Sequence, residues 1–373
     1  MRYLRLRYKM ILLAALLIAC AACVIGLLKI TRNLDSQYEY LRWQNESEMQ
    51  FAQVSVFVPK SDGLTVNGIG VFRNETAKKI SEASLDMESD AKLFTDCWSC
   101  NDSMRVSSDK ANGSCPVTAI GGDFFAFHPL RLLSGSYIRE NDLLKDTVVV
   151  DENLAWFLFG SADVTGMEIG INNRHFYIAG VVERESDKAS RKAYTGDMGL
   201  FMSWEAYTEL LKEEEAAREA VITCYELCMP NPVKNFASGF VQEKFPKGTG
   251  EIIENSGRFS VPRLLSVARN SFSWIISSGV PYPYWENAAR FAETRAAGLL
   301  VTAFMIIFTP ALGTVVMVIR KQKKSIEHFR EEIAPGLREK REEAIRARQR
   351  QRWEKQHADF KEFAGYNKKD QSD

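Results

Sequence analysis

Two cysteines in the segment from Phe94 to Asn101, FTDCWSCN, could do chemistry, because Cys97 and Cys100 form a Cys-x-x-Cys pair. Such a pair is typical of a thiol redox site or of one half of a structural zinc site. A redox pair needs a helix N-terminus that lowers the pKa of its first thiol, and a zinc site needs two further soft ligands. The elements that position the two thiols therefore decide between these chemistries.

The flanking segments KLFTD and NDSMRV predict a strand, a turn and a second strand, without the helix that redox chemistry needs. Three interpretations remain: a structural disulfide among Cys97, Cys100 and Cys115, inert free thiols, or a metal or redox site with a partner such as His128. The pattern favours the disulfide. The segment VITCYELC predicts another strand, which places Cys224 and Cys228 about 13 Å apart, too far to bridge.

Two uncharged apolar runs lie towards the ends of the chain, and each is long enough to cross a membrane. The run 10–28 would be about 28 Å long as a helix, and the run 296–319 about 36 Å, against a hydrocarbon core of about 30 Å. Pro310 lies near the middle of the second run and predicts a kink or tilt there. We therefore expect two transmembrane helices.

Charge predicts the orientation of these helices. Residues 1–9 carry 4 basic and no acidic side chains, and residues 320–373 carry 16 basic and 11 acidic ones. The positive-inside rule therefore places both termini in the cytoplasm and residues 29–295 outside the cell membrane. The outer part holds 28 basic and 37 acidic side chains, a balance that gives no reason to expect nucleic-acid binding.

A second interpretation of the N-terminus concerns Cys20. The segment Leu17-Ile18-Ala19-Cys20 is similar to a bacterial lipoprotein cleavage site that follows a basic and then an apolar region. The sequence stays apolar for eight residues beyond this point, which favours an uncleaved membrane span.

The periodicity between the spans predicts an α/β (α+β) extracytoplasmic domain, which we expect to form two subdomains. Predicted strands are 54–59, 66–72, 116–125 and 146–150, and Asp151 is expected to cap a short helix after the last of them. A hairpin is expected through Asn172 and Asn173, followed by alternating helices and strands to residue 255. The first membrane helix is expected to continue into residues 30–50, and the second to begin near Trp285.

The segment GGDFFAFHPLRLLSGSYIRENDLLKDTVVVDENLAWFLFG, followed by VTGMEIGINNRHFYIAGVVE, resembles the MacB-like periplasmic core domain of ABC-type permeases, which include macrolide and lipoprotein exporters and FtsX-like proteins. We expect structural roles, as turns or core, for the residues that carry the pattern. These are Gly121, Gly122, Asp123, Phe124, Phe125, Gly135, Leu158, Phe159, Gly160 and Gly180.

The resemblance implies a permease that works with a separate ATPase and as a dimer. Family permeases have four membrane spans, whereas this sequence has two and a charged tail. The expected organisation is a cytoplasmic N-terminus (1–9), a first membrane helix (10–28), the extracytoplasmic domain (29–295), a second membrane helix (296–319) and a cytoplasmic helical tail (320–373). Expected partners are the lipid bilayer, a second copy or a four-span permease, and an ABC ATPase.

Catalysis is not expected. The sequence has no Gly-x-x-x-x-Gly-Lys-Ser/Thr loop and no Gly-x-Ser-x-Gly motif, and only His128 and His175 among histidines lie between the spans. We therefore expect a non-enzymatic exporter subunit without a cofactor or metal. The alternative is an extracellular sensor or scaffold that signals through the charged tail, which could also lie on anionic lipid or pair with a partner helix.

Overall fold

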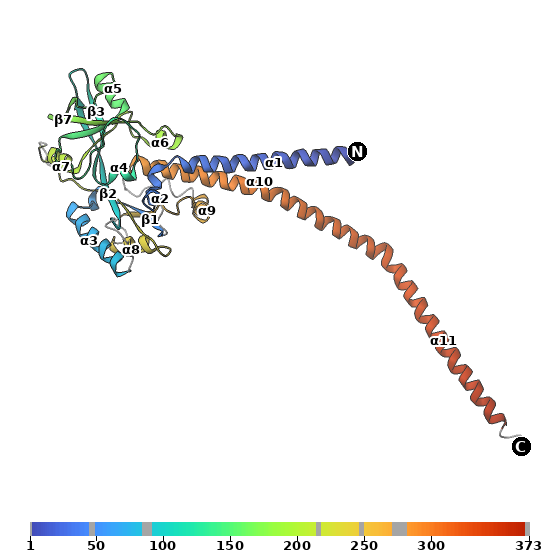
Figure 1. Ribbon diagram of the computed structural model, residues 1–373. Helices are drawn as coiled ribbons and strands as arrows, with labels where there is room; N and C mark the ends of the chain where they lie inside the picture. The colour runs from blue at the N-terminus through green and yellow to red at the C-terminus, as the bar shows by residue number, and fades with distance from the viewer. Residues whose placement is uncertain are drawn as a thin grey trace. The chain divides into compact units, whose positions relative to one another are not determined.

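The computed structural model describes residues 2–44, 49–83, 92–213, 218–245, 250–270 and 282–369 (Figure 1). The chain divides into two compact units, Met1–Ala303 and Phe304–Asp373. The first unit contains a mixed α/β domain, which we call the sheet domain and which comprises the described residues from 34 to 270. The predicted fold class is thereby confirmed.

Ten strands of the sheet domain form one sheet. They are β1 (Phe51–Phe57), β2 (Thr95–Ser107), β3 (Asn112–Gly122), β4 (Leu132–Gly135), β5 (Thr147–Asp151), β6 (Glu168–Ile171), β7 (Arg174–Val182), β8 (Leu200–Ser203), β9 (Cys224–Pro230) and β10 (Glu251–Glu254). Their order is β10-β1-β9-β2-β3-β8-β5-β7-β4, and β6 pairs with both β2 and β7.

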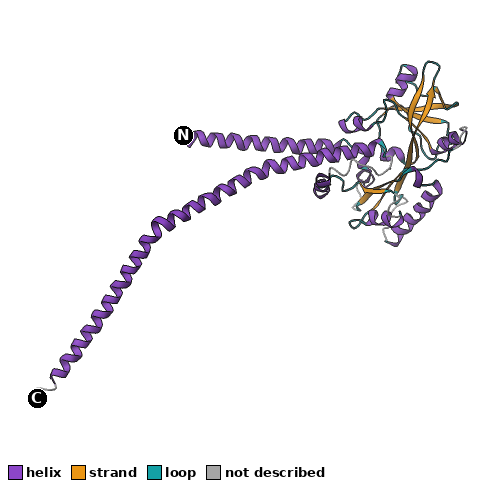
Figure 2. Ribbon diagram, turned by 180° about the vertical axis from the view of Figure 1, so that it is seen from behind, coloured by secondary structure: helices purple, strands orange, loops and turns teal. Residues whose placement is uncertain are grey.

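The two expected subdomains are two parts of this single sheet. The N-terminal half of β2 pairs with β9, whereas its C-terminal end pairs with β6, and β3 runs antiparallel to β2 along its whole length from Cys97 to Ser107. Figure 2 shows the two groups of strands that this long pair joins. Because β2 belongs to both groups, backbone hydrogen bonds along this strand make the two groups one continuous sheet.

The first unit also contains ten helices or parts of helices in its described residues. They are α1 (Arg2–Arg32), α2 (Glu39–Gln44), α3 (Val66–Glu82), α4 (Phe124–Phe127), α5 (Glu152–Phe159), α6 (Lys188–Ala193), α7 (Trp204–Glu213), α8 (Phe236–Lys244), α9 (Val261–Asn270) and the start of α10 (Tyr284–His328). Short 3-10 helices span Asp35–Gln37 and Lys60–Asp62.

Alternation along the strands gives the sheet two different buried faces. In β5, Val148 and Val150 belong to one apolar cluster with residues of α3, α5, α7 and α8, whereas Val149 belongs to a second cluster. The second cluster includes Phe124 and Phe127 of α4 and Trp285 of α10. The first residues of α10 are therefore part of the core of the sheet domain.

The end of α1 packs beside α10. Leu34 lies in one small cluster with Ala288 and Ala292, and Leu27 packs against another that contains Ala296 and Ala297. Alanine on α10 lets the helices approach closely, which increases van der Waals contact. The chain therefore enters and leaves the sheet domain through two adjacent helices.

Several local predictions are confirmed. Asp151 caps α5, since its Oδ1 accepts a hydrogen bond from the N–H of Leu154. The hairpin between β6 and β7 turns through Asn172 and Asn173, both with positive φ, as a type I′ turn requires. Helices α7 and α8 and strands β9 and β10 also follow the expected alternation of helices and strands. The helix expected over 203–220 is shorter, because α7 ends at Glu213, residues 214–217 lie outside the described part and residues 218–220 are not helical.

Three predictions of local structure around helices are wrong. The strand expected over 116–125 ends at Gly122, and Phe124 and Phe125 belong to α4. Residues 66–72 were expected to form a strand, but they begin α3, because the Thr65 side chain accepts the N–H of Gly68 and starts a helix whose buried face is Ile69, Phe72, Thr76 and Ile80. The extension of the first helix is interrupted after Arg32 by the 3-10 turn at Asp35–Gln37, where Leu34 turns into the core.

The second unit is helical. It contains the remainder of α10, which continues without a break through Pro310 to His328, a π-helix (Phe329–Ile333) and α11 (Ala334–Lys369). Two helices of the described chain are long and apolar enough to cross a membrane, one in Met10–Arg32 and one in Tyr284–Lys355. Residues 370–373 of the expected tail lie outside the described part.

Candidate functional site

Six charged side chains, three of them almost fully buried, meet where α10 joins the sheet domain. We call Arg258, Arg263, Arg290, Glu251, Glu286 and Glu293 the junction cluster. Arg258 Nη1 donates to Glu286 Oε2 at 2.6 Å, and Arg258 Nη2 donates to Glu286 Oε1 at 2.8 Å and to Glu293 Oε2 at 3.1 Å. The side chains of Arg258, Glu286 and Glu293 are at most 1% exposed. One arginine thus holds two glutamates that lie about two turns apart on α10.

The outer members of the junction cluster balance its charge. Arg290 Nε donates to Glu286 Oε1 at 2.6 Å, Arg290 Nη2 lies 2.8 Å from Glu251 Oε2 of β10, and Arg263 Nε lies 3.4 Å from Glu293 Oε1. Three arginines and three glutamates sum to zero charge. Burial acts to lower the pKa of Arg258, but the two carboxylates raise it by more, so the guanidinium stays charged.

A polar chain leads from the junction cluster to α4. Arg258 Nη1 also donates to Asn255 Oδ1 at 3.3 Å, Asn255 Nδ2 donates to Ser55 Oγ at 2.8 Å, and Ser55 Oγ donates to Glu226 Oε1 at 2.7 Å. The other oxygen of Glu226 lies 2.6 Å from His128 Nε2, directly after α4. Hydrogen bonds therefore connect α10 with β1, β9 and α4.

His128 is also held by stacking. Its ring lies 4.2 Å from that of Trp285 and 4.5 Å from that of Phe124, centroid to centroid. Among the described residues its Nδ1 has no hydrogen-bond partner. The ring therefore sits between α4 and the first turn of α10, where any displacement of the helix changes its contacts.

Cys97, His128 and Glu226 are the only described trio of this kind that could hold a metal ion, since one ligand atom from each lies within 4.8 Å of the others. All three are buried, and β2 and β9 place Cys97 opposite Glu226. Burial and the nearby Glu226 carboxylate raise the pKa of the Cys97 thiol well above its ordinary value. The trio offers soft and hard donors, but the His128–Glu226 pair is already satisfied without an ion.

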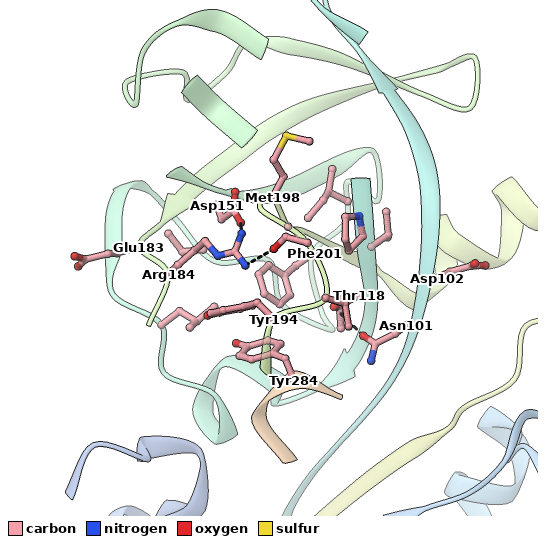
Figure 3. Close-up of a pocket in the computed structure, with 18 of the residues that line it drawn as sticks. Asn101, Asp102, Thr118, Asp151, Glu183, Arg184, Tyr194, Met198, Phe201 and Tyr284 are labelled. Carbon is pink, nitrogen blue, oxygen red and sulfur yellow. Dashed lines mark hydrogen bonds and ion pairs between the residues drawn. The ribbon is translucent and has the colours of Figure 1, made fainter. Parts of the chain in front are cut away.

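A pocket of about 220 Å³ lies beside the start of α10 (Figure 3). Arg184, Tyr194, Phe201 and Tyr284 line it, together with Asp151 at one end. Arg184 Nη2 donates to the Gly196 carbonyl at 2.7 Å, and its guanidinium carbon lies 3.9 Å from the centre of the Tyr194 ring. The rings of Tyr194 and Tyr284 stack at 4.4 Å.

Asp151 caps α5 through one carboxylate oxygen and lines the pocket beside Arg184 with the other. Its Oδ2 lies 3.3 Å from Arg184 Nη1, close enough for an ion pair, although the two atoms do not have hydrogen-bond geometry. Burial raises the pKa of Asp151 to about 7, against the lowering effect of the Leu154 N–H and of Arg184. Near neutral pH a substantial fraction of Asp151 therefore carries a proton.

The predicted disulfide is absent from the structure, in which Cys97, Cys100 and Cys115 are free thiols. The predicted turn is wrong, because both cysteines of the Cys-x-x-Cys pair lie within β2 and, three residues apart, face opposite sides of the sheet. Cys115 pairs with Met104, four positions from Cys100, or about 13 Å along the strand. Cys224 and Cys228 lie on β9, as expected.

The residues of the recognised pattern lie at turns and in the core. Gly122 and Gly135 have φ of +67° and +76°, and a Cβ at Gly135 would lie 2.0 Å from the Ala179 carbonyl oxygen. Gly121 lies beside Trp98, and Gly160 ends α5. Gly180 lies opposite Gly135 in the pairing of β4 with β7. Asp123 Oδ2 accepts from Thr95 Oγ1 at 2.8 Å. Phe124, Phe125, Leu158 and Phe159 belong to the two apolar clusters or pack against them.

Sequence reasoning missed both the junction cluster and the pocket. A usable signal for the first was the spacing of Glu286, Arg290 and Glu293, which places three charges on one face of an alanine-rich helix next to a membrane span. For Arg184 and Tyr194 the sequence held no comparable signal, because the pocket depends on how distant strands pair.

Comparison with known proteins concerns mainly the sheet domain. No curated protein matches the chain. The periplasmic region of MacB from Actinobacillus actinomycetemcomitans is similar, with 16% identity over 55% of this chain and 89% of that one and a TM-score of 0.37. The extracellular domain of the ABC-type transporter YknZ from Gram-positive bacteria is 15% identical over 51% of this chain and 88% of its own length, with a TM-score of 0.30.

The family match is more extensive. The model of the MacB-like periplasmic core domain matches residues 12–224, more than half of the chain and including the whole pattern from Gly121 to Val182. The resemblance predicted from these residues is thus confirmed. The chain belongs to the family of ABC transporter permease proteins with a MacB-like periplasmic core domain.

Proposed function

We propose that the chain is a non-enzymatic membrane subunit of an ABC-type exporter or envelope complex, in which the sheet domain moves with the membrane helices that a separate ATPase drives. The observation that carries this proposal is the junction cluster. Buried ion pairs hold their geometry tightly, because any separation leaves uncompensated charge in an apolar environment. A rotation of α10 would therefore be transmitted to β10 and β1 rather than absorbed at a flexible joint.

The shared sheet supports the same role. A displacement of α10 reaches β9 through His128 and Glu226, and β9 pairs with β2, which extends into both groups of strands. In this proposal the two groups of strands move together with α10, and the sheet domain thereby acts on a substrate or a partner outside the membrane. This role needs no catalytic residue.

The proposed topology places both termini in the cytoplasm and residues 29–295 outside. The five cysteines of the sheet domain are buried, so they leave a low background for thiol labelling of intact cells. A membrane-impermeant maleimide should label a Leu143→Cys variant, whose position is 98% exposed, and should leave Ala347→Cys on α11 unlabelled until the membrane is opened. The reverse pattern would refute the topology.

A membrane partner is proposed because two helices cannot enclose a transport path. Gly298 and Gly313 on α10 have open space where a side chain would project, which lets a second helix approach closely. Exchange of Gly298 and Ala303 for leucine should weaken crosslinking to a second copy or to a four-span permease. Val301→Leu, on the same helix, is the matched control and should leave crosslinking unchanged.

The experiment that tests the main proposal is purification of the tagged full chain in mild detergent. Recovery of a nucleotide-binding subunit supports the exporter role. An environment-sensitive fluorophore on Thr294→Cys, an exposed position of α10 near the junction cluster, should then change its emission when ATP is added. The same label on Leu143→Cys reports whether the change reaches the distal loop.

The second candidate is a sensor or scaffold that signals through the charged tail. It is favoured by the pocket beside Tyr284, since a ligand there would touch the first turn of the helix that leads to the tail. Isolation of the full chain without any nucleotide-binding subunit, together with no effect of ATP on the Thr294 label, would replace the exporter role by this one.

A further inference from the structure

The charged side chains around the pocket differ in whether they have hydrogen-bond or ion-pair partners. Glu183 pairs with Arg131, and Asp102 accepts from Tyr207 Oη at 2.9 Å and lies 3.3 Å from Arg218. In Figure 3 both carboxylates lie at the margin and point away from the centre. Their charges therefore contribute little to what the pocket attracts.

Arg184 is different. Its side chain is largely buried, and among the described residues its Nη1 has no hydrogen-bond acceptor. A buried donor without a partner costs about 1–3 kcal/mol. The structure keeps this donor at the pocket because the stack on Tyr194 and the bond to Gly196 fix the guanidinium in place. Because Nη1 is closed off by the surrounding atoms, an incoming acceptor would reach it only by displacing the Asp151 carboxylate, whose Oδ2 lies 3.3 Å away.

The walls of the pocket favour a flat molecule. The stacked rings of Tyr194 and Tyr284 lie on one side and Phe201 lies near the centre, with Met198 above it in Figure 3. An apolar cavity of about 150 Å³ is large enough for benzene. The volume here, about 220 Å³, leaves room for an aromatic ring with a short polar chain.

We propose that this pocket binds a small aromatic carboxylate, with its ring against Tyr194, Tyr284 and Phe201 and its carboxylate on Arg184. A carboxylate fits because it accepts charge-assisted hydrogen bonds from a guanidinium. The partly protonated state of Asp151 near neutral pH leaves part of the Arg184 charge uncompensated. A cationic ligand would instead be repelled by the positive charge of Arg184, because water does not screen the two charges at this largely buried position.

Binding has a structural consequence that does not depend on whether the chain works with an ATPase. Tyr284 is the first residue of α10, and it stacks edge-on against Trp285, which contacts His128. A ligand packed against Tyr284 therefore stabilises one position of the α10 start relative to the sheet. The pocket is in this way placed to bias the helix that enters the membrane.

The test uses three ligands with the same ring and different charge: indole-3-acetate, indole-3-acetamide and tryptamine. Binding to the purified full chain in detergent is measured by ligand-observed saturation-transfer NMR. Indole-3-acetate should bind saturably and at least ten-fold more tightly than the amide, and tryptamine should not compete. Binding at the pocket itself is followed through the ¹³C-methyl signal of Met198, assigned with Met198→Leu.

Variants separate the two halves of the proposal. Arg184→Gln should remove the preference for the acetate over the amide. Arg174→Gln should leave it unchanged, because Arg174 pairs with Glu209 and Glu213, which do not line the pocket. Tyr194→Phe should retain binding and Tyr194→Leu should weaken it. The proposal is overturned if the intact protein shows no saturable binding of indole-3-acetate, if tryptamine binds best, or if the Met198 signal does not move. The first two outcomes need no variant to fold.

Discussion

Replacement of Arg258 by methionine should destabilise the protein strongly, for reasons that the junction cluster makes explicit. The substitution removes one positive charge from a neutral set of six and leaves Glu286 and Glu293 almost fully buried. Removing one partner of a buried ion pair costs about 3–5 kcal/mol. Each glutamate retains one cation, Arg290 at 2.6 Å or Arg263 at 3.4 Å, so we expect the lower end, about 3 kcal/mol.

Glu286→Met alone should cost a similar amount, because Arg258 then keeps only Glu293. The double replacement should cost far less than the sum. It removes one charge of each sign and leaves two complete pairs, Arg290 with Glu251 and Arg263 with Glu293. Apolar replacement of a whole buried pair is often close to neutral. A residual loss of about 0.5 kcal/mol is expected because Glu286 lies in the first turn of α10.

The assay is thermal unfolding of the full chain in detergent, followed by near-ultraviolet circular dichroism at several scan rates. A loss of about 3 kcal/mol corresponds to a fall in Tm of about 6–12 °C for a domain of this size. Lys78→Met removes an exposed pair with Glu82 at 3.7 Å and should change Tm very little. Single replacements that cost under about 1 kcal/mol, or an additive double replacement, would refute the coupling that we ascribe to the junction cluster.

Three further predictions concern the sheet domain. Since the pKa of Asp151 is raised from 3.8 to about 7 on folding, the folded state holds a proton that the unfolded state lacks between these pH values. Stability should therefore fall as pH rises through this range, by on the order of 4 kcal/mol, and Asp151→Asn, which keeps the helix cap, should flatten this dependence of Tm on pH. Gly135→Ala should prevent stable folding, because its Cβ would overlap the Ala179 carbonyl, whereas Gly160→Ala, with similar φ but open space, should cost only about 1 kcal/mol in urea unfolding. Ellman's reagent without a reductant should detect the sheet-domain thiols, Cys97 and Cys100 among them, only after denaturation; reaction that requires prior reduction would contradict the free thiols.

The sequence alone was sufficient for features that depend on neighbouring residues. The hairpin through Asn172 and Asn173, the cap at Asp151 and the strand at Cys224–Pro230 were all predicted, because turn chemistry, capping and two-residue alternation act over a few residues. The two apolar runs likewise predicted two helices long enough to cross a membrane, and the pattern from Gly121 to Val182 predicted the family. Other predictions of local structure failed. Residues 66–72 were predicted as a strand but begin a helix, and the Cys97–Cys100 segment was predicted as a turn but lies within β2.

Only the tertiary structure decided which distant residues meet. Strand β9 inserts between β1 and β2, which brings Glu226 to Ser55 and, across the sheet face, to His128. Arg258 reaches α10 across 28 residues, some of which lie outside the described part. Pairing of this kind depends on which surfaces bury one another, and the same local pattern is compatible with many strand orders. The periodicity of this chain therefore determined most of its elements, while the way in which those elements bury one another decided the junction cluster and the pocket.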